Sequence, residues 1–310
     1  MSRLSSNHLL GLEGVPRKDI ELILDTADTF REVLDRTIKK VPTLRGITVL
    51  NLFYEASTRT RISFELAEKR LSADTIAFTK AGTSVAKGES LRDTVQNIEA
   101  MKIDMVVVRH SSAGTPYFLT QCMDSNIINA GDGAHEHPTQ ALLDMYTIRK
   151  KYKKLDGLRV VLVGDVRHSR VIRSNIWGLK TMGASVALCG PATLLPREIE
   201  QFGCDLYTDL DSALDGADVV NVMRIQLERQ QAGLFPSQRE YTNLWGINRE
   251  RLKRLNKNYT IMHPGPINRG VEITSDVADG DKSVILEQVT NGQAVDRKST
   301  RLNSSHESPS

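Results

Sequence analysis

The chain has 310 residues, of which 40% are hydrophobic and 25% are charged, and its 41 basic and 38 acidic residues leave a formal net charge of +3. This composition is typical of globular proteins, and the length allows two domains. The charges are interspersed rather than gathered into basic blocks, which argues against a nucleic-acid partner. The three cysteines form no CxxC pair and no apolar run has membrane-spanning length. We therefore expect a soluble cytoplasmic protein without a zinc site.

Short apolar runs alternate with helical patterns along the chain. The first helix is predicted from Pro16 to about Lys39, and a second begins over 62–67. The predicted strands are 47–53, 75–78, 105–108, 127–130, 160–163, 185–188, 219–223 and 260–262, and the remaining predicted helices are 91–101, 138–150, 171–182 and 248–255. This alternation is typical of α/β proteins, so we expect two open parallel sheets, each with helices on both faces.

Two composition changes divide the chain. The lysine-rich segment 149–154 ends a long predicted helix, and a new strand begins near Leu158. We place the domain boundary there, which gives domains of 1–150 and 151–295. The last fifteen residues, 296–310, include five serines and a single large aliphatic residue, Leu302. Such a segment cannot bury a helical face, so we expect an atypical, non-native and disordered tail fused to a truncated chain.

The densest group of hydrogen-bond donors is the STRTR segment at 57–61, between a predicted strand and a predicted helix. Its three hydroxyl and two guanidinium groups would add to the unpaired N–H groups and the positive dipole end of that helix. This arrangement favours binding of a phosphate or a similarly dense anion. The alternative is an ordinary helix cap with arginines on a solvated face.

Polar residues also follow five other predicted strands. In open α/β sheets, ligands bind beyond the carboxyl ends of the strands, so such clusters point to ligand sites. The five segments are Arg109–His110, His135–Gln140, Gly164–Arg170, Arg224–Gln226 and His263–Pro266. The turn at Gly164 lacks a GxGxxG pattern, which argues against binding of NAD.

Simpler explanations exist for several of these residues. Arg109 could pair with an acid. His135, Glu136 and His137 suggest a metal site, but residues so close together at a helix start do not converge as an HExxH pair does. A donor role toward a carbonyl or phosphate oxygen is favoured for His137. The polar segment 82–89 is either a solvated loop or a closing loop that delivers Lys87 to an anion.

Together, five segments resemble the aspartate/ornithine transcarbamoylase family, and its aspartate branch in particular. They are STRTRISFE at 57–65, SVAKGES at 84–90, HPTQALLDMYTI at 137–148, VGDVRHSRV at 163–171 and HPGPINRGVEI at 263–273. The resemblance runs from about residue 1 to about residue 295. It implies the transcarbamoylase fold, with a carbamoyl-phosphate-binding domain at 1–150 and an aspartate-binding domain at 151–295. It also implies a homotrimer of catalytic chains, alone or in a larger assembly.

The resemblance further implies a role for each matching residue. Carbamoyl phosphate would be bound by Ser57, Thr58, Arg59, Thr60, Arg109, His137, Gln140 and the backbone of Gly265 and Pro266. Within this set, the catalytic residues would be Arg59, Thr60, Arg109 and His137. Aspartate would be bound by Lys87, Arg170, Arg224 and Gln226. Ser84 and Lys87 would come from the neighbouring subunit, although Thr83 fits the position of Ser84 equally well.

The implied reaction transfers the carbamoyl group of carbamoyl phosphate to the amino group of L-aspartate, in pyrimidine biosynthesis, without a metal or cofactor. Fixed guanidinium, hydroxyl and imidazole donors suit the negative charge that builds on oxygen when an amine attacks the carbamoyl carbon. Arg170 and Arg224 suit the carboxylates of aspartate, and the ornithine branch typically has HCLP where this chain has HPGP. The alternatives are a transcarbamoylase for another amino acceptor, such as ornithine, and a non-catalytic scaffold subunit.

Overall fold

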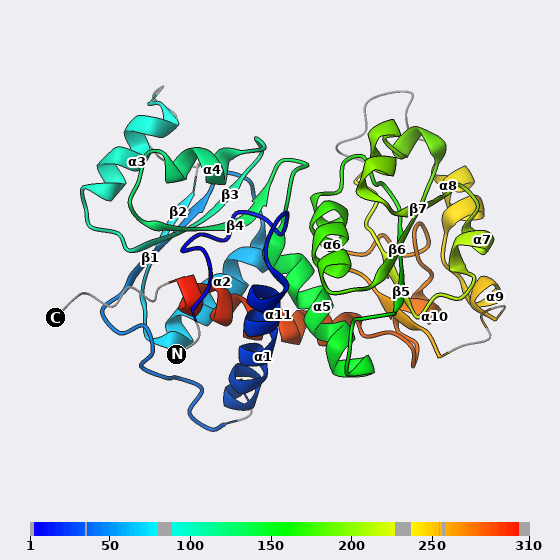
Figure 1. Ribbon diagram of the computed structural model, residues 1–310, viewed down its shortest axis with the longest axis horizontal. Coiled ribbons are helices and arrows are strands. Elements are labelled where there is room, and N and C mark those ends of the chain that lie inside the picture. Colours follow the sequence, from blue (N-terminus) through cyan, green and yellow to red (C-terminus); the bar gives the residue numbers. More distant parts are fainter. Residues whose placement is uncertain are drawn as a thin grey trace. The chain divides into compact units, whose positions relative to one another are not determined.

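The chain folds into two compact units. The computed structural model describes residues 3–34, 36–79, 89–226, 237–253, 255 and 258–303. Unit 1 comprises Met1–Leu143 together with Asn291–Ser310, and unit 2 comprises Asp144–Thr290. Each unit is built on one parallel sheet with helices packed around it, which confirms the α/β prediction (Figure 1). The division falls inside the helix Pro138–Tyr152, rather than after residue 150.

Unit 1 contains four parallel strands in the order β2-β1-β3-β4. Their bounds are β1 Thr48–Phe53, β2 Asp74–Thr79, β3 Met105–His110 and β4 Asn126–Asp132. The central strands β1 and β3 are neighbours, and Phe53 lies opposite Arg109. The strand order therefore reverses between them, and open α/β sheets bind ligands at such a point.

The helices of unit 1 cover this sheet. They are α1 Arg17–Leu34, α2 Thr58–Leu71, α3 Leu91–Glu99, α4 Thr115–Thr120 and the start of α5 Pro138–Tyr152. The apolar residues Ile20, Ile23, Leu24, Ala27 and Phe30, which recur at helical spacing in α1, are buried. The helix ends at Leu34 instead of Lys39, and beyond that end Ile38 is 76% exposed.

The prediction of a disordered tail from Asp296 is wrong for the residues that the structure describes. Helix α11 covers Ile285–Asn303 and runs beside α1 and α2 (Figure 1). Arg31 of α1 donates a hydrogen bond to Asn291, and Arg70 Nη1 of α2 donates one to Gln293 Oε1 at 2.6 Å. Residues 304–310 lie outside the described part of the chain. Polar contacts therefore hold this helix to unit 1 together with the fully buried Ala294 and Val295.

Buried hydroxyl groups near the end of α11 form hydrogen bonds within the helix itself. Asp296, Ser299 and Thr300 are all buried. The hydroxyl groups of Ser299 and Thr300 donate to the carbonyl oxygens of Val295 and Asp296, at 3.1 and 2.8 Å. A hydroxyl bonded within its own helix can be buried without an unpaired donor. Polar side chains that form hydrogen bonds can thus be buried in a helix with few apolar residues, which is why the expected disorder is not found here.

Asp296 of α11 and Glu68 of α2 are buried acids with strongly altered proton affinity. Burial raises the pKa of Asp296 to about 7, against the opposing hydrogen bond from Ser63 Oγ to its carboxylate. Burial also raises the pKa of Glu68 to about 7, although Asn51 Nδ2 donates to its carboxylate at 2.7 Å. Unfolded carboxyl groups have pKa values near 4. The folded chain therefore binds more protons than the unfolded chain between about pH 4 and pH 7, and the free energy of unfolding falls as the pH rises through this window.

The substitution Asp296→Asn should remove the part of this pH dependence that Asp296 causes. At pH 8 the free energy of unfolding should rise relative to the parent chain, by up to about 4 kcal/mol, because no buried charge is formed. Near pH 4 the two chains should differ little. Urea unfolding at both pH values measures the difference, with Asp25→Asn at an exposed position of α1 as the control. Equal stability of Asp296→Asn and the parent at pH 8 would contradict this account.

Unit 2 contains five parallel strands in the order β7-β6-β5-β8-β9. Their bounds are β5 Arg159–Val163, β6 Ser185–Cys189, β7 Asp205–Tyr207, β8 Val219–Val222 and β9 Thr260–Met262. The short β7 was not predicted, because three residues carry too little pattern. The strand order reverses between β5 and β8, where Val160 lies opposite Val219. This is the second position in the chain that suits a ligand.

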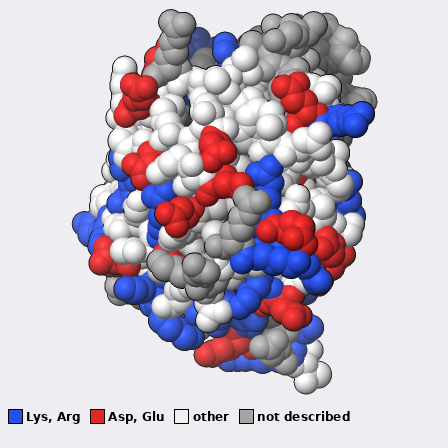
Figure 2. Space-filling model, turned by 90° about the vertical axis from the view of Figure 1, so that its right-hand side faces the viewer, with Lys and Arg blue, Asp and Glu red and all other residues white. Residues whose placement is uncertain are grey.

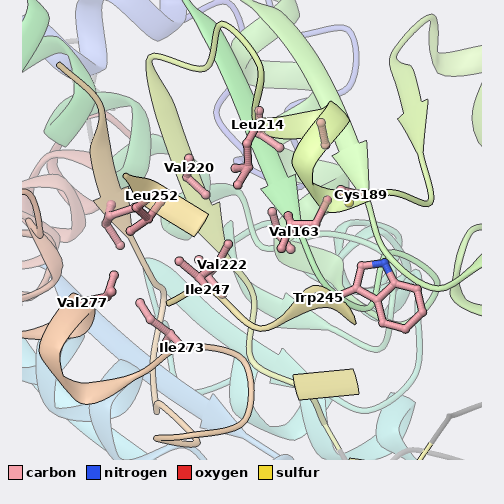
Figure 3. Packing of buried hydrophobic residues seen from close by; sticks show 14 of the residues in the cluster. Val163, Cys189, Leu214, Val220, Val222, Trp245, Ile247, Leu252, Ile273 and Val277 are labelled. Carbon is pink, nitrogen blue, oxygen red and sulfur yellow. The ribbon is translucent and has the colours of Figure 1, made fainter. Parts of the chain in front are cut away.

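Helices surround the second sheet, and those from α7 to α10 share one apolar core with it. They are α6 Arg170–Thr181, α7 Leu210–Leu214, α8 Gln238–Trp245, α9 Arg249–Leu252 and α10 Ser275–Ala278, with two 3₁₀ helices at Ala192–Leu194 and Arg197–Phe202. Figure 3 shows Val163 and Val222 of the sheet packed in a cluster with Leu214. No helix in the described part of the chain is long and apolar enough to span a membrane. The face drawn in Figure 2 carries basic and acidic side chains side by side, as the interspersed charges predict.

Candidate functional site

The STRTR segment lies where the sequence predicts it, at the turn from β1 into α2. Ser57 is the N-cap residue, but among the described residues its side chain caps no N–H group of the helix; instead, Ser57 Oγ donates to Thr60 Oγ1 at 2.9 Å. Thr58 and Arg59 are exposed, and the first turn of this fully described helix contains no acidic residue. The positive end of the helix dipole is thus not neutralised by a carboxylate of its own first turn. These are the properties of an anion-binding helix start.

Arg109 lies at the end of β3, beside the strand that leads into the STRTR segment. Its Nη2 pairs with Glu55 Oε1 at 2.6 Å, and its Nη1 donates to the carbonyl oxygen of Ala130 at 3.0 Å. The backbone N–H of Tyr54 donates to the carbonyl oxygen of Arg109 at 2.9 Å. The acid pairing considered from the sequence is therefore present. It holds the guanidinium beside residues 54–57, where an anion would compete with Glu55 for the same donors.

His137 directly precedes α5, and Gln140 lies in the first turn of that helix. His137 is 7% exposed, and Thr139 Oγ1 lies 3.5 Å from its Nδ1. Gln140 is half-buried, and its backbone N–H donates to the carbonyl oxygen of His137 at 3.1 Å. This position at a helix start suits a donor role for His137.

The loop before His137 is organised around the buried carboxylate of Asp132. The backbone N–H groups of Gly114 and Glu136 donate to it at 2.8 and 3.1 Å, and Asn129 Nδ2 donates at 2.8 Å. Burial alone would raise the pKa of Asp132, but hydrogen bonds from His135, Asn129 and Gly114 together lower it. Asp132 is thus a fixed negative charge that sets the conformation of the loop.

One group of described residues has metal-ligand spacing: Glu13, His135 and Glu136, with ligand atoms within 4.8 Å of one another. The two carboxylate oxygens of Glu136 accept the backbone N–H groups of Leu12 and Glu13, at 2.7 and 3.2 Å. His135 Nδ1 lies 3.1 Å from Asp132 Oδ2. These contacts give Glu136 a structural role, since it fastens the N-terminal segment to the loop before α5. Because both oxygens of Glu136 and the Nδ1 of His135 already have partners, few ligand atoms remain for a cation.

In unit 2, the loop from β5 to α6 positions Arg170. Gly164 has φ 140°, and a Cβ at this position would lie 3.1 Å from the Cβ of Met223, so glycine lets the ends of β5 and β8 approach closely. Asp165 accepts hydrogen bonds from the backbone N–H and the ring Nδ1 of His168, at 3.1 and 2.9 Å. Ser169 caps α6. Arg170, the first residue of α6, is therefore held on a well-fixed turn and is 5% exposed.

The segments after β8 and β9 form one hydrogen-bonded region. Arg224 and Gln226 are half-buried directly after β8. After β9, the backbone N–H of Gly265 donates to His263 Nδ1 at 2.8 Å. Asn268 Nδ2 donates to the carbonyl oxygen of Ile225 at 3.0 Å. Asn268 was given no role in the sequence analysis, because its partner is the backbone of a residue far away in the sequence.

The predicted site residues are divided between the two units. Unit 1 contains Ser57, Thr58, Arg59, Thr60, Arg109, His137 and Gln140, and unit 2 contains Arg170, Arg224, Gln226, Gly265 and Pro266. In each unit, these residues follow the ends of parallel strands, as predicted. Ser84 and Lys87, together with the alternative Thr83, lie outside the described residues.

Family models match both halves of the chain. The model for the aspartate/ornithine carbamoyltransferase carbamoyl-P binding domain matches residues 7–150, and that for the Asp/Orn binding domain of the same enzymes matches residues 156–297. The chain belongs to the aspartate/ornithine carbamoyltransferase family. The resemblance stated from five sequence segments is thereby confirmed.

Family members of known name extend this comparison. The chain is 58% identical to the aspartate carbamoyltransferase catalytic subunit of Halothermothrix orenii over 292 residues, covering 94% of this chain and 93% of that one. It is 59% identical to that of Gemmatimonas aurantiaca over 287 residues, covering 93% and 90%. A structure of Trypanosoma cruzi aspartate transcarbamoylase with carbamoyl phosphate and aspartate matches with a TM-score of 0.84 and 26% identity, over 95% of each chain. Pyrococcus furiosus ornithine carbamoyltransferase matches with a TM-score of 0.85 and 26% identity, over 97% and 98%, so the fold alone does not separate the two branches of the family.

Proposed function

We propose that this chain transfers the carbamoyl group of carbamoyl phosphate to the amino group of L-aspartate, giving N-carbamoyl-L-aspartate and phosphate in pyrimidine biosynthesis. The observation that carries this function is the donor-rich start of α2 beside Arg109, in a chain about 58% identical to named aspartate carbamoyltransferase catalytic subunits. The two arginines after β5 and β8 favour a dicarboxylate acceptor over ornithine. A non-catalytic scaffold would not need this set of donors.

Unit 1 would bind carbamoyl phosphate. The phosphate would accept hydrogen bonds from the first N–H groups of α2 and from Ser57, Thr58, Arg59 and Thr60. Arg109 and His137 would donate to the carbamoyl oxygen, where negative charge grows when the amine nitrogen attacks the carbon. The bond from the carbamoyl carbon to the phosphate oxygen then breaks, and the departing phosphate accepts the proton of the amine. No side chain need act as a base in this scheme.

Unit 2 would bind aspartate and part of the carbamoyl group. Planar guanidinium groups at Arg170 and Arg224 can each pair with a carboxylate through two hydrogen bonds. Gln226 would complete the part of the aspartate site in unit 2, Lys87 would reach it from a neighbouring subunit, and the backbone at Gly265 and Pro266 would contact the carbamoyl group. Holding both substrates in register lowers the entropic part of the barrier.

The direct test is a carbamoylation assay with the purified chain, using aspartate and ornithine at equal concentrations with carbamoyl phosphate. We expect kcat/KM for aspartate to exceed that for ornithine by at least about 100-fold, because a site built for two carboxylates leaves its charges unpaired with ornithine. Similar use of both acceptors would refute the assignment of aspartate. Absence of any carbamoyl transfer would refute the function itself.

We further propose that the enzyme is a cytoplasmic homotrimer in which Ser84 and Lys87 reach the site of a neighbouring subunit. If so, mixing a Lys87→Ala chain with an Arg59→Ala chain should restore activity from two inactive parents, since some sites then contain both intact residues. Activity after subunit exchange measures this. A mixture of Arg59→Ala and Arg109→Ala chains is the control, because both residues serve the same chain's site and no recovery is expected. No recovery in the first mixture would refute a shared site.

A further inference from the structure

His263 is the centre of a buried hydrogen-bond network in unit 2. The side chain is fully buried, and its Nδ1 accepts the backbone N–H of Gly265 at 2.8 Å. A backbone N–H can only donate, so Nδ1 is the acceptor nitrogen and the other ring nitrogen carries the proton. That nitrogen, Nε2, lies 3.2 Å from Glu272 Oε1. The imidazole is thus fixed in one tautomer and one orientation by contacts at both ring nitrogens.

Glu272 also binds the backbone of the loop that follows His263. Its side chain is fully buried, and Oε1 also accepts the backbone N–H of Asn268 at 2.6 Å. One carboxylate oxygen therefore holds both ends of the segment 263–268. Gly265 and Pro266, the residues proposed to contact the carbamoyl group, lie between those ends.

A second set of hydrogen bonds holds the backbone of His263. Gln288 Oε1 accepts the backbone N–H of His263 at 2.9 Å, and Gln288 Nε2 donates to Asp144 Oδ1 at 2.9 Å. The other oxygen of Asp144 accepts hydrogen bonds from the side-chain amides of Asn175 and Asn221, at 2.9 and 3.2 Å. All these residues belong to unit 2. These hydrogen bonds tie the loop to the core of unit 2, although the buried oxygens Glu272 Oε2, Asn175 Oδ1 and Asn221 Oδ1 have no partner among the described residues.

Asn268 connects this loop to the segment after β8. Its backbone N–H is bound by Glu272, while its side-chain Nδ2 donates to the carbonyl oxygen of Ile225 at 3.0 Å. Ile225 is buried and stands between Arg224 and Gln226 in the chain. The backbone that presents the two proposed aspartate ligands therefore accepts a hydrogen bond from a side-chain amide of the proposed carbamoyl loop.

We infer that Asn268 is a positioning residue that couples the carbamoyl loop to the aspartate-binding segment, with His263 and Glu272 holding it in place. This inference rests on the proposed function and adds residues that act through others rather than on the substrates. Ligand-holding groups must be kept within a fraction of an ångström of their productive positions, and supporting hydrogen bonds do this. Without the amide of Asn268, the carbonyl oxygen of Ile225 loses its link to the loop, and Arg224 and Gln226 lose their alignment.

The substitution Asn268→Ala tests the coupling. We expect the KM for aspartate to rise about five- to tenfold, the effect of one lost hydrogen bond. The kcat at saturating aspartate should stay within about threefold, and the melting temperature should stay close to that of the parent. Hydrogen exchange of the backbone amides of residues 223–226 should become faster. The matched control is Asn258→Ala, which removes an exposed asparagine of the same unit whose side chain accepts from Lys282.

The outcomes separate this inference from the proposed function. A parent chain that does not carbamoylate aspartate refutes the proposed function, and exchange at 223–226 then still decides whether Asn268 holds that segment. With an active parent, an Asn268→Ala chain that matches Asn258→Ala in KM and exchange overturns the inference. If Asn268→Ala lowers both kcat and the melting temperature well below those of Asn258→Ala, the residue merely supports the fold. That result would also overturn the inference. If Asn268→Ala does not fold, Asn268→Ser provides the same measurement with a smaller loss of polarity.

Discussion

Replacing Arg59 by alanine should lower kcat by about two to three orders of magnitude, the effect known for loss of a single donor to a developing oxyanion. Arg59 is exposed at the start of α2, next to hydroxyl groups and helix N–H groups that would bind the same phosphate. Its charge would be most important in the transition state, when the phosphate departs. Steady-state kinetics with saturating carbamoyl phosphate and aspartate measures the loss.

Two further variants separate this role from a general effect of charge. Arg59→Lys should recover little activity, because a single ammonium group cannot replace the two-pronged guanidinium. Arg17→Ala removes an arginine of α1 that pairs with Glu21 on the surface, and it should leave kcat within about twofold. Activity of Arg59→Ala within about tenfold of the parent would exclude Arg59 from the catalytic set.

The sheet architecture and the strand-end clusters could be predicted because they follow from local patterns. Strands such as β3 and β5 are buried on both faces and are therefore nearly continuous apolar runs. The STRTR segment follows β1 directly, so its place at the carboxyl end of a strand required no knowledge of tertiary structure. What the pattern could not supply was the order of the strands, which decides that β1 and β3 are neighbours.

The features that the sequence did not predict depend on contacts between distant residues. The buried Asp296 accepts a hydrogen bond from Ser63 of α2, and Arg31 and Arg70 donate hydrogen bonds to α11. The local sequence around each of these side chains does not indicate its distant partner. Likewise, the sequence around Asn268 indicates only a turn, whereas the structure shows that its side-chain amide donates to the backbone of Ile225. Polar contacts of this kind have no periodicity, so a pattern-based analysis misses them.

Arg224 should be more important for aspartate than for carbamoyl phosphate, because the two substrates are assigned to residues of different units. We expect Arg224→Ala to raise the KM for aspartate by about two to three orders of magnitude. Loss of a bidentate pair with a carboxylate removes two charge-assisted hydrogen bonds, each worth about 1.5–3 kcal/mol. Arg224→Lys should recover only a small part of this loss.

The same variant should bind carbamoyl phosphate nearly as the parent does, since most of the proposed contacts for that substrate, from Ser57 to Gln140, belong to unit 1. Calorimetry with carbamoyl phosphate alone measures this affinity, and steady-state kinetics measures the KM for aspartate. Arg239→Ala, at an exposed arginine of α8 in the same unit, should change neither quantity. A comparable loss of both affinities in Arg224→Ala would show that the arginine maintains the whole site. Loss confined to aspartate would establish that unit 2 recognises the acceptor, and that the carboxylate-binding arginine after β8 separates this chain from transcarbamoylases that use ornithine.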